Sequence, residues 1–281
     1  MITNTQIGYC GRLGNQLFQY AILKAISNKT GYQIILPTTL SNRIWHGQKC
    51  ILSYFKLPSC IYSDVSMEFL YEEPESRYYD ENIYSIPDNT NLSGFFQHPK
   101  YYEHLQEDLR LEFELIESIQ NKILQLLSTY TKPTVSLHMR RGDLSDGSTG
   151  NPIDVTWSND YSKGSVVSNY YTSALSIIPY DSTIFLFTGG SRDGKVNPAD
   201  IQWCLENFND SRIVYLDNLS DIETFALMTM CDYNITSFAS TFSWWASFLN
   251  KNENVIAPKV YYPTYTSLTA DLVYPKNWTL I

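Results

Sequence analysis

In the first part of the chain, apolar residues recur at near-helical spacing over Gln16–Asn28. This spacing predicts an amphipathic helix that follows the glycine-rich segment Gly11–Asn15 and ends at Gly31. Short apolar runs on either side, Ile7–Cys10 and Tyr32–Leu36, predict strands. A strand, a helix and a second strand in this order are typical of a βαβ unit.

The segment Thr38–Asn91 is less regular, because proline, serine, asparagine and acidic residues interrupt it. We expect short elements and loops there. Beyond it, one long amphipathic helix is predicted, with an apolar face made of Leu105, Leu109, Phe113, Ile116, Ile119, Ile123 and Leu127. Thr131–Pro133 ends this helix and predicts a domain boundary. We therefore expect an N-terminal domain over residues 1–131 and a C-terminal domain over residues 132–281.

The C-terminal half alternates more regularly between strand and helix patterns. Strands are expected over Thr134–His138, Thr183–Phe187, Arg212–Leu216, Tyr233–Thr236 and Val255–Ala257. Helices are expected over Ser168–Ile178, Pro198–Asn207, Asp221–Met230 and Thr241–Leu249, and a polar loop over Leu144–Ser165. This alternation predicts an α/β fold with a parallel, doubly wound sheet, in which ligands bind beyond the carboxyl ends of the strands.

The composition is that of a globular protein, with 281 residues, 43% of them hydrophobic, and a formal net charge of −9. An acidic chain disfavours non-specific nucleic-acid binding, which needs a broad basic surface, so any phosphate site has to be local. The five cysteines are scattered, which indicates buried thiols in a reducing compartment rather than a disulfide or zinc framework. Neither a secretion signal nor an apolar stretch long enough to span a bilayer is evident. We therefore expect a soluble cytoplasmic protein.

Two adjacent arginines, Arg140 and Arg141, stand at the end of a predicted strand, between His138 and Asp143. Arginine forks bind phosphate oxygens in a bidentate way. A strand that ends in cations, a turn glycine and a carboxylate is therefore suited to hold a small anion at a sheet edge. The alternative is a surface ion pair between Arg141 and Asp143, which contributes little to stability.

Two further polar segments follow predicted strands. Ser237–Ser243 opens a helix, where hydroxyls and free backbone N–H groups form a ready anion site, although ordinary N-capping by Ser240 or Thr241 is the alternative. Gly11–Asn15 lacks the G-x-G-x-x-G spacing of a dinucleotide fingerprint. No D-x-D triplet occurs, which disfavours a transferase in which paired carboxylates hold a metal on a diphosphate. Arginines and helix-end N–H groups are the natural substitutes for that metal.

Taken together and in order, motifs along nearly the whole chain resemble the α-1,2-fucosyltransferases of glycosyltransferase family 11. These motifs are Gly11–Tyr20, Gly94–Tyr102, His138–Asp143, Asn169–Tyr171, Asp200–Cys204, Ser240–Trp245 and Pro275–Trp278. The resemblance implies a GT-B-like α/β fold of two facing Rossmann-type domains with mostly parallel sheets. It also implies a galactoside 2-α-L-fucosyltransferase that moves L-fucose from GDP-fucose to the 2-hydroxyl of a galactoside, with inversion and without a metal or other cofactor.

The same resemblance implies roles for the residues around the two arginines. Arg140 is expected on the β-phosphate of the donor, where negative charge develops as the bond to fucose breaks. Arg141 is expected to support that contact or the motif's own fold, and His138 to lie near the nucleotide. Asp143 is a candidate catalytic base, although it is equally suited to orient either arginine, and a strongly dissociative reaction needs no base.

Further residues are expected to bind the donor. The resemblance places the pyrophosphate beside Gly14 and Asn15 of the N-terminal domain. The hydroxyl residues expected to bind phosphate are Ser240, Thr241 and Ser243.

The chain departs from the family pattern where the family commonly has a strand followed by Ser-Asp-Asp, a place at which related enzymes use a carboxylate to recognise guanine. Here Gly189–Pro198 intervenes, Ala199 replaces the first carboxylate, and Asp200 fits the second. We expect Asp200 to face the base. The long loop Leu144–Ser165 is a second departure, suited to shape acceptor choice or to act as a lid.

The partners implied by the resemblance are a GDP-sugar donor and a galactose-containing oligosaccharide or lipid-linked glycan as acceptor. With the missing secretion signal, this indicates surface glycan synthesis by a protein peripheral to the inner membrane face. Two other hypotheses stay open. One keeps the fold and mechanism with another GDP-linked hexose, and the other is a non-catalytic nucleotide- or glycan-binding protein.

Overall fold

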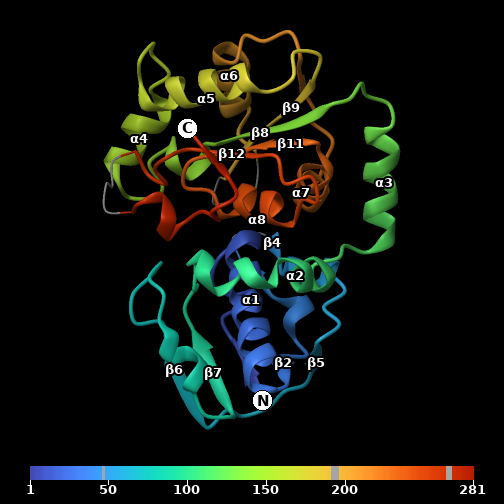
Figure 1. Ribbon diagram of the computed structural model, residues 1–281, viewed down its shortest axis with the longest axis vertical. Helices are drawn as coiled ribbons and strands as arrows, with labels where there is room; N and C mark the ends of the chain where they lie inside the picture. The colour runs from blue at the N-terminus through green and yellow to red at the C-terminus, as the bar shows by residue number, and fades with distance from the viewer. Residues whose placement is uncertain (46–47, 191–195, 264–267) are drawn as a thin grey trace. The chain divides into compact units, whose positions relative to one another are not determined.

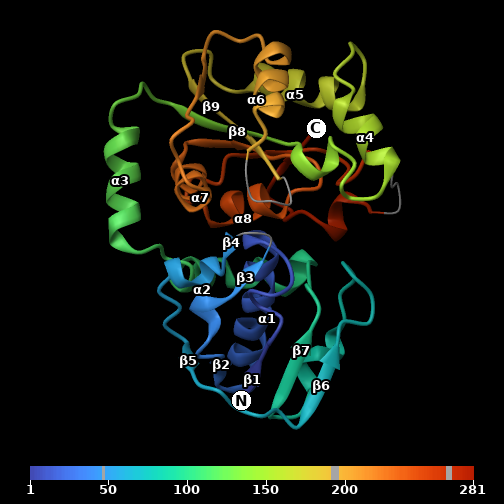
Figure 2. The same ribbon diagram turned by 180° about the vertical axis from the view of Figure 1, so that it is seen from behind.

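The structure is a computed structural model that describes residues 1–45, 48–190, 196–263 and 268–281. The chain forms two α/β units, each with its own sheet (Figures 1 and 2). The first unit comprises Met1–Glu117 with Asp271–Pro275, and the second comprises Ser118–Ala270 with Lys276–Ile281. Helix α3 (Glu117–Leu127) begins at this division, whereas the predicted boundary lies after residue 131, beyond the end of that helix.

The first unit contains a five-stranded sheet in the order β5-β2-β1-β7-β6, and all its neighbouring strands pair in parallel. Its strands are β1 (Ile2–Thr3), β2 (Ile34–Leu36), β5 (Cys60–Tyr62), β6 (Phe69–Glu72) and β7 (Thr90–Ser93). A separate antiparallel ribbon joins β3 (Ile44–Trp45) and β4 (Gln48–Lys49). Short 3-10 turns are η1 (Leu40–Asn42), η2 (Ile51–Tyr54), η3 (Glu81–Ser85), η4 (Pro99–Tyr101) and η5 (Glu103–Leu105).

Helix α1 (Leu13–Thr30) contains the predicted helix and extends it at both ends. Most of it is buried, including Gln16 and Gln19, whose side-chain amides donate to carbonyls of the turn that precedes the helix. Gly31 ends the helix as predicted, in the left-handed conformation with φ of 77°, and its N–H donates to the carbonyl of Ser27.

The strand predicted over Ile7–Cys10 is wrong. Residues 5–11 form consecutive turns and bends, in which the N–H groups of Tyr9 and Cys10 both donate to the carbonyl of Gln6. Gly8 has φ of +80°, a conformation that interrupts an extended strand. Ile7 is nevertheless fully buried. A residue that is buried in a turn gives the same apolar pattern in the sequence as a residue that is buried in a strand, and this similarity led to the wrong prediction.

The single long helix predicted from Leu105 to Leu127 is also wrong. Two helices, α2 (Gln106–Glu112) and α3, replace it. Between them, Leu115 forms an antiparallel bridge with Phe55, a residue far earlier in the chain. This non-local pairing supplies partners for backbone groups that a continuous helix would have used, and the helical periodicity of the apolar residues cannot reveal it.

The second unit contains a six-stranded parallel sheet in the order β10-β9-β8-β11-β12-β13. Its strands are β8 (Thr134–Arg140), β9 (Thr183–Gly189), β10 (Ile213–Tyr215), β11 (Tyr233–Ile235), β12 (Val255–Ala257) and β13 (Thr279–Leu280). Its later helices are α5 (Val166–Ile177), α6 (Pro198–Asn207), α7 (Asp221–Met230) and α8 (Thr241–Leu249). Helices α5 and α6 lie on one side of the sheet and α7 and α8 on the other (Figures 1 and 2). The predicted parallel, doubly wound sheet is confirmed.

The region expected to be a polar loop, Leu144–Ser165, contains a helix, α4 (Pro152–Asn159). Asn151 caps it by accepting the N–H of Ile153 at 3.1 Å, and proline occupies its first turn. Two further 3-10 turns are η6 (Gly142–Leu144) and η7 (Ala270–Leu272).

Candidate functional site

The two arginines lie where the central strand β8 ends, between β9 and β11. The N–H of Arg140 donates to the hydroxyl of Ser237 at 2.7 Å, and the N–H of Arg141 donates to the carbonyl of Gly189 at 3.0 Å. These contacts hold the backbone at the strand end against both neighbouring strands. We call residues 140–145, which leave the sheet here, the arginine loop.

Arg141 is enclosed by protein, and its side chain is 5% exposed. Its Nε donates to Asp200 at 2.9 Å, its Nη1 to the carbonyl of Ser158 at 2.8 Å, and its Nη2 to Asn159 at 2.7 Å. The guanidinium carbon lies 3.7 Å from the centre of the Trp203 ring, a cation–π contact. Every nitrogen of this guanidinium has a protein partner, which favours the second of its two implied roles, support of the motif's own fold.

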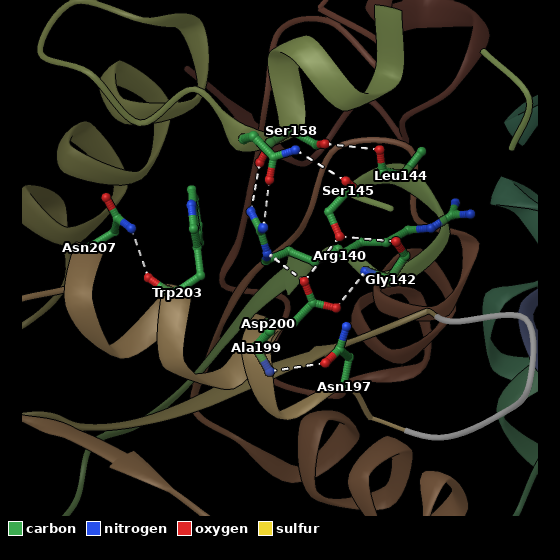
Figure 3. Close-up of polar contacts among 12 residues, drawn as sticks. Arg140, Gly142, Leu144, Ser145, Ser158, Asn197, Ala199, Asp200, Trp203 and Asn207 are labelled. Carbon is green, nitrogen blue, oxygen red and sulfur yellow. Dashed lines mark hydrogen bonds and ion pairs between the residues drawn. The ribbon is translucent and has the colours of Figure 1, made fainter. Parts of the chain in front are cut away.

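Asp200, the ion-pair partner of Arg141, lies in the first turn of α6, and its side chain is 4% exposed. Its Oδ2 accepts the N–H of Gly142 at 3.0 Å, and its Oδ1 also accepts the hydroxyl of Ser145 at 3.0 Å (Figure 3). A carboxylate is favourable here, because the N-terminus is the positive end of the helix dipole. The contact between Asp200 and guanine stays a prediction.

Arg140 is the more accessible arginine, with a side chain that is 20% exposed. Its Nη2 donates to both carboxylate oxygens of Asp143 at 3.0 Å, and its Nη1 donates to the carbonyl of Ala239. Its Nε is buried and has no hydrogen-bond partner among the described residues. Burial, the largest single effect, lowers the pKa of this guanidinium, but the charge and hydrogen bonds of Asp143 together with the nearby Tyr261 and Tyr262 raise it by more, so the net pKa is raised. Arg140 is therefore a fixed cation that keeps an unused donor.

The ion pair between Arg141 and Asp143 that the sequence left open is wrong, because each arginine has its own aspartate. Asp143 pairs with Arg140, which is the orienting role considered for it. Ala239 completes this arrangement from the other side of Arg140. It has φ of 52°, an uncommon conformation for a residue other than glycine, in which its carbonyl meets the guanidinium.

His138 lies two residues before Arg140 on β8 and is 6% exposed. Burial, together with the positive charge of Arg140, lowers its pKa to about 3, so the ring is neutral at neutral pH. Its Nδ1 is buried and has no hydrogen-bond partner within the described ranges. The ring centre lies 5.9 Å from that of Phe242 in the first turn of α8. A neutral imidazole with an unfilled nitrogen is suited to hydrogen-bond a ligand.

The hydroxyl-rich segment before α8 forms a cap. The hydroxyl of Ser240 accepts the N–H of Ser243 at 3.3 Å, which confirms N-capping by Ser240. The hydroxyl of Ser243 in turn accepts the N–H of Ser237 at 3.2 Å. Ser240 and Ser243 are buried, and Thr241 is half-buried. That these residues bind phosphate stays a prediction, in which Thr241 is the most accessible of the three.

Gly14 and Asn15 belong to the first unit, in the first turn of α1. The Oδ1 of Asn15 accepts the side-chain amide of Gln97 at 2.9 Å. Gly11 has φ of +88°, and a Cβ there would lie 2.4 Å from the Cβ of Asn15, so only glycine fits. The pyrophosphate contact of Gly14 and Asn15 stays a prediction.

The remaining predicted residues gather in the second unit around the end of β8. Sequence reasoning missed Ser158 and Asn159, because they fall in a presumed loop, and Ala239, which carries no chemical signal. Trp203 and Gln97 do lie in motifs that the sequence singled out, without a role assigned to them. Ser191–Lys195, the centre of the insertion, lies outside the described residues.

Over the described ranges, no group of three or more His, Cys, Asp or Glu side chains is arranged to hold a metal ion. None of the helices in the part of the chain that the structure describes is long and apolar enough to cross a membrane.

A family model described as Glycosyl transferase family 11 matches residues 2–281. Galactoside alpha-(1,2)-fucosyltransferase 2 of Rattus norvegicus is 25% identical over 265 residues, which are 89% of this chain and 68% of that protein. The protein of the same name from Bos taurus is 26% identical over 269 residues, 89% of this chain and 70% of its own length.

Among solved structures, POFUT1 in complex with GDP-fucose is similar with a TM-score of 0.51 and 11% sequence identity. The likeness covers 91% of this chain and 97% of that chain. It concerns the fold, and the predicted α/β class with two mostly parallel sheets is confirmed.

Proposed function

Because the chain belongs to glycosyl transferase family 11, we propose that it transfers L-fucose from GDP-fucose to the 2-hydroxyl of a galactoside, with inversion and without a metal ion. The names of the relatives, galactoside alpha-(1,2)-fucosyltransferases, support the reaction and the linkage. The acceptor in this proposal is a galactose-containing oligosaccharide or lipid-linked glycan. The cytoplasmic location expected from the sequence stays a prediction.

The observation that carries the proposal is the arrangement of Arg140. Its guanidinium is held by Asp143 and Ala239, yet its Nε has no hydrogen-bond partner among the described residues. Cleavage of the bond between fucose and the diphosphate leaves negative charge on the β-phosphate. A cation that is already fixed in place stabilises such developing charge without reorganisation, which is the most effective way to lower the barrier.

Two neighbouring features fit the same donor. The start of α8 is the positive end of a helix dipole, which is suited to bind an anion, and Thr241 there has a half-buried side chain with a hydroxyl. His138 stays neutral because its pKa lies near 3, so it is suited to hydrogen-bond the nucleotide without adding charge. In this arrangement cationic and N–H groups do what a metal does in transferases with paired carboxylates.

The first experiment measures the melting temperature with GDP, UDP, ADP and CMP, each in the presence of EDTA. A ligand that binds the native state stabilises it by about 2.7 kcal/mol at a hundredfold excess over its dissociation constant. We expect a rise with GDP alone. A larger rise with another nucleotide, or no rise with any of them, would contradict the proposed donor.

The second experiment incubates the protein with GDP-fucose and a panel of galactosides, again with EDTA, and determines the linkage and anomeric configuration of the product by NMR. We expect a fucosyl-α-1,2-galactoside. Faster transfer from another GDP-linked hexose would favour that donor instead. Tight GDP binding with neither transfer nor donor hydrolysis would indicate a non-catalytic binding protein.

A further inference from the structure

We propose that Asp200 is a positioning residue that holds the arginine loop in its working conformation, and that it does not recognise the guanine base. This inference rests on the proposed function, and it replaces the role that the family resemblance implied for Asp200. The contacts of its carboxylate carry the argument.

Three donors converge on Asp200, and all of them come from the arginine loop. They are the Nε of Arg141, the backbone N–H of Gly142 and the hydroxyl of Ser145, at 2.9, 3.0 and 3.0 Å (Figure 3). A carboxylate has about four acceptor positions. Guanine offers its N–H groups as an adjacent pair that needs both oxygens, so recognition of the base would require Asp200 to release the loop.

These contacts lie on both sides of Asp143. Gly142 precedes Asp143 and is bound through its backbone, and Ser145 follows it and is bound through its side chain. Asp143 in turn fixes Arg140 through two contacts of 3.0 Å. Asp200 therefore acts on the phosphate-binding cation through the loop, although it does not touch that cation.

The buried ion pair joins three segments that are distant in the sequence. Asp200 belongs to the start of α6 and Arg141 to the arginine loop, and the guanidinium also reaches the end of α4 at Ser158 and Asn159. The hydroxyl of Ser158 and the amide of Asn159 bind back to carbonyls at the end of the same loop. The region for which shaping of acceptor choice and action as a lid were the two predicted roles is thus tied to the arginine loop at its α4 end.

The test is Asp200→Asn, a change that keeps the shape of the side chain and removes its charge. Two readouts separate the roles: kcat and KM for GDP-fucose measured well below the melting temperature, and the thermal shifts with GDP and with inosine diphosphate, which lacks the 2-amino group. If Asp200 is a positioning residue, kcat of Asp200→Asn should fall by about tenfold or more, because a small displacement of a catalytic group slows the reaction strongly. The positioning role also predicts that KM and the preference for GDP stay within about twofold.

A residue that recognises guanine would give the opposite result. The preference for GDP over inosine diphosphate would change by about tenfold or more, because a side chain that binds a base through paired hydrogen bonds discriminates against a base that lacks one of the two donors. That outcome would overturn the inference. A merely structural residue would lower the melting temperature and leave kcat per folded molecule unchanged, which would overturn it as well.

Ser145→Ala is the second variant, since it removes one neutral donor to Asp200 and is expected to fold even if Asp200→Asn does not. We expect a smaller fall in kcat, a few-fold, with an unchanged GDP preference, and an unaltered kcat would contradict the inference.

Asp210→Asn is the matched control, because Asp210 is ion-paired with Arg212 at 2.7 Å before the edge strand β10. If the wild type shows no shift with GDP, the proposed function itself fails. If it shifts and Asp200→Asn alters base preference, only this inference fails.

Discussion

The arginine loop takes part in two arginine–aspartate ion pairs, Arg141 with Asp200 and Arg140 with Asp143, which differ in burial and in hydrogen bonding. On one side, Arg141 and Asp200 are 5% and 4% exposed, and every guanidinium nitrogen has a protein partner. On the other, Arg140 is 20% exposed, is paired with Asp143, and has an Nε without a hydrogen-bond partner among the described residues.

Two arginines that are adjacent in the sequence can therefore have different roles. A saturated, buried guanidinium cannot bind a ligand without first losing its own contacts, so Arg141 stabilises the loop. A guanidinium with unused donor capacity and a fixed position is suited to bind charge that appears during a reaction, which is the role proposed for Arg140.

The largest effect is expected from Arg141→Ala, read as stability. The change leaves Asp200 buried without its cation, and breaking a buried pair in this way costs about 3–5 kcal/mol. Urea unfolding measures the loss. Arg212→Ala is the control, because Arg212 is as exposed as Arg140 and pairs with Asp210 on a partly open surface, where a loss of about 1 kcal/mol is expected. Equal losses of unfolding free energy for both variants would show that the buried Arg141–Asp200 pair stabilises the fold no more than the more exposed Arg212–Asp210 pair.

Arg140→Ala should affect activity rather than stability. Loss of a preorganised group that stabilises developing charge lowers kcat by about 10²–10³-fold. The free energy of unfolding should change by about 1 kcal/mol, because the side chain is partly exposed. Kinetics of fucosyl transfer and urea unfolding of the same preparation test the split. Near-normal turnover would show that Arg140 has no part in the reaction.

His138 lies near Arg140 on strand β8 and makes the stability of the protein depend on pH. Its pKa is about 3 in the folded protein, lowered by burial and by Arg140, and about 6.5 in an unfolded chain. The unfolded state binds the extra proton between these values, so stability falls as the pH is lowered through 6.5. Between pH 7 and pH 5 this contributes about 2 kcal/mol of lost stability.

The measurement compares urea unfolding of the wild type and His138→Asn at pH 7 and pH 5. The variant should lose less stability than the wild type over this interval, by the amount that His138 contributes. Parallel losses would mean that His138 is able to take up a proton in the folded state.

The smallest effect is expected from Asp143→Asn. Because Asp143 orients Arg140 through two contacts, the variant should retain activity with a loss of about tenfold. A catalytic base would instead account for about 10²–10⁴-fold and for the acidic limb of the dependence of kcat on pH. A full pH profile of kcat for the variant and the wild type distinguishes these outcomes.

Much of the fold was predictable because its signals are local. Helices α6, α7 and α8 have the predicted bounds, and each begins at a polar cap: Asn197 before Pro198, Ser220 with a capping box, and Ser240. The errors arose where distant backbone decided the outcome. Leu115 pairs with Phe55 and so divides the predicted long helix, and the turns around Gly8 replace a predicted strand.

Local signals in the sequence were enough to predict strands β8–β12 and helices α5–α8 in order, the parallel sheet of the second unit, and a cluster of charged residues at the end of β8. These follow from periodicity, caps and residue type, which act over a few neighbouring positions. The choice of partner depends on the folded chain, in which Arg140 pairs with Asp143 and Arg141 with Asp200. The physical reason is that hydrogen-bond partners are chosen by proximity in the folded chain, and two residues separated by 59 positions in the sequence carry no local signal of that proximity.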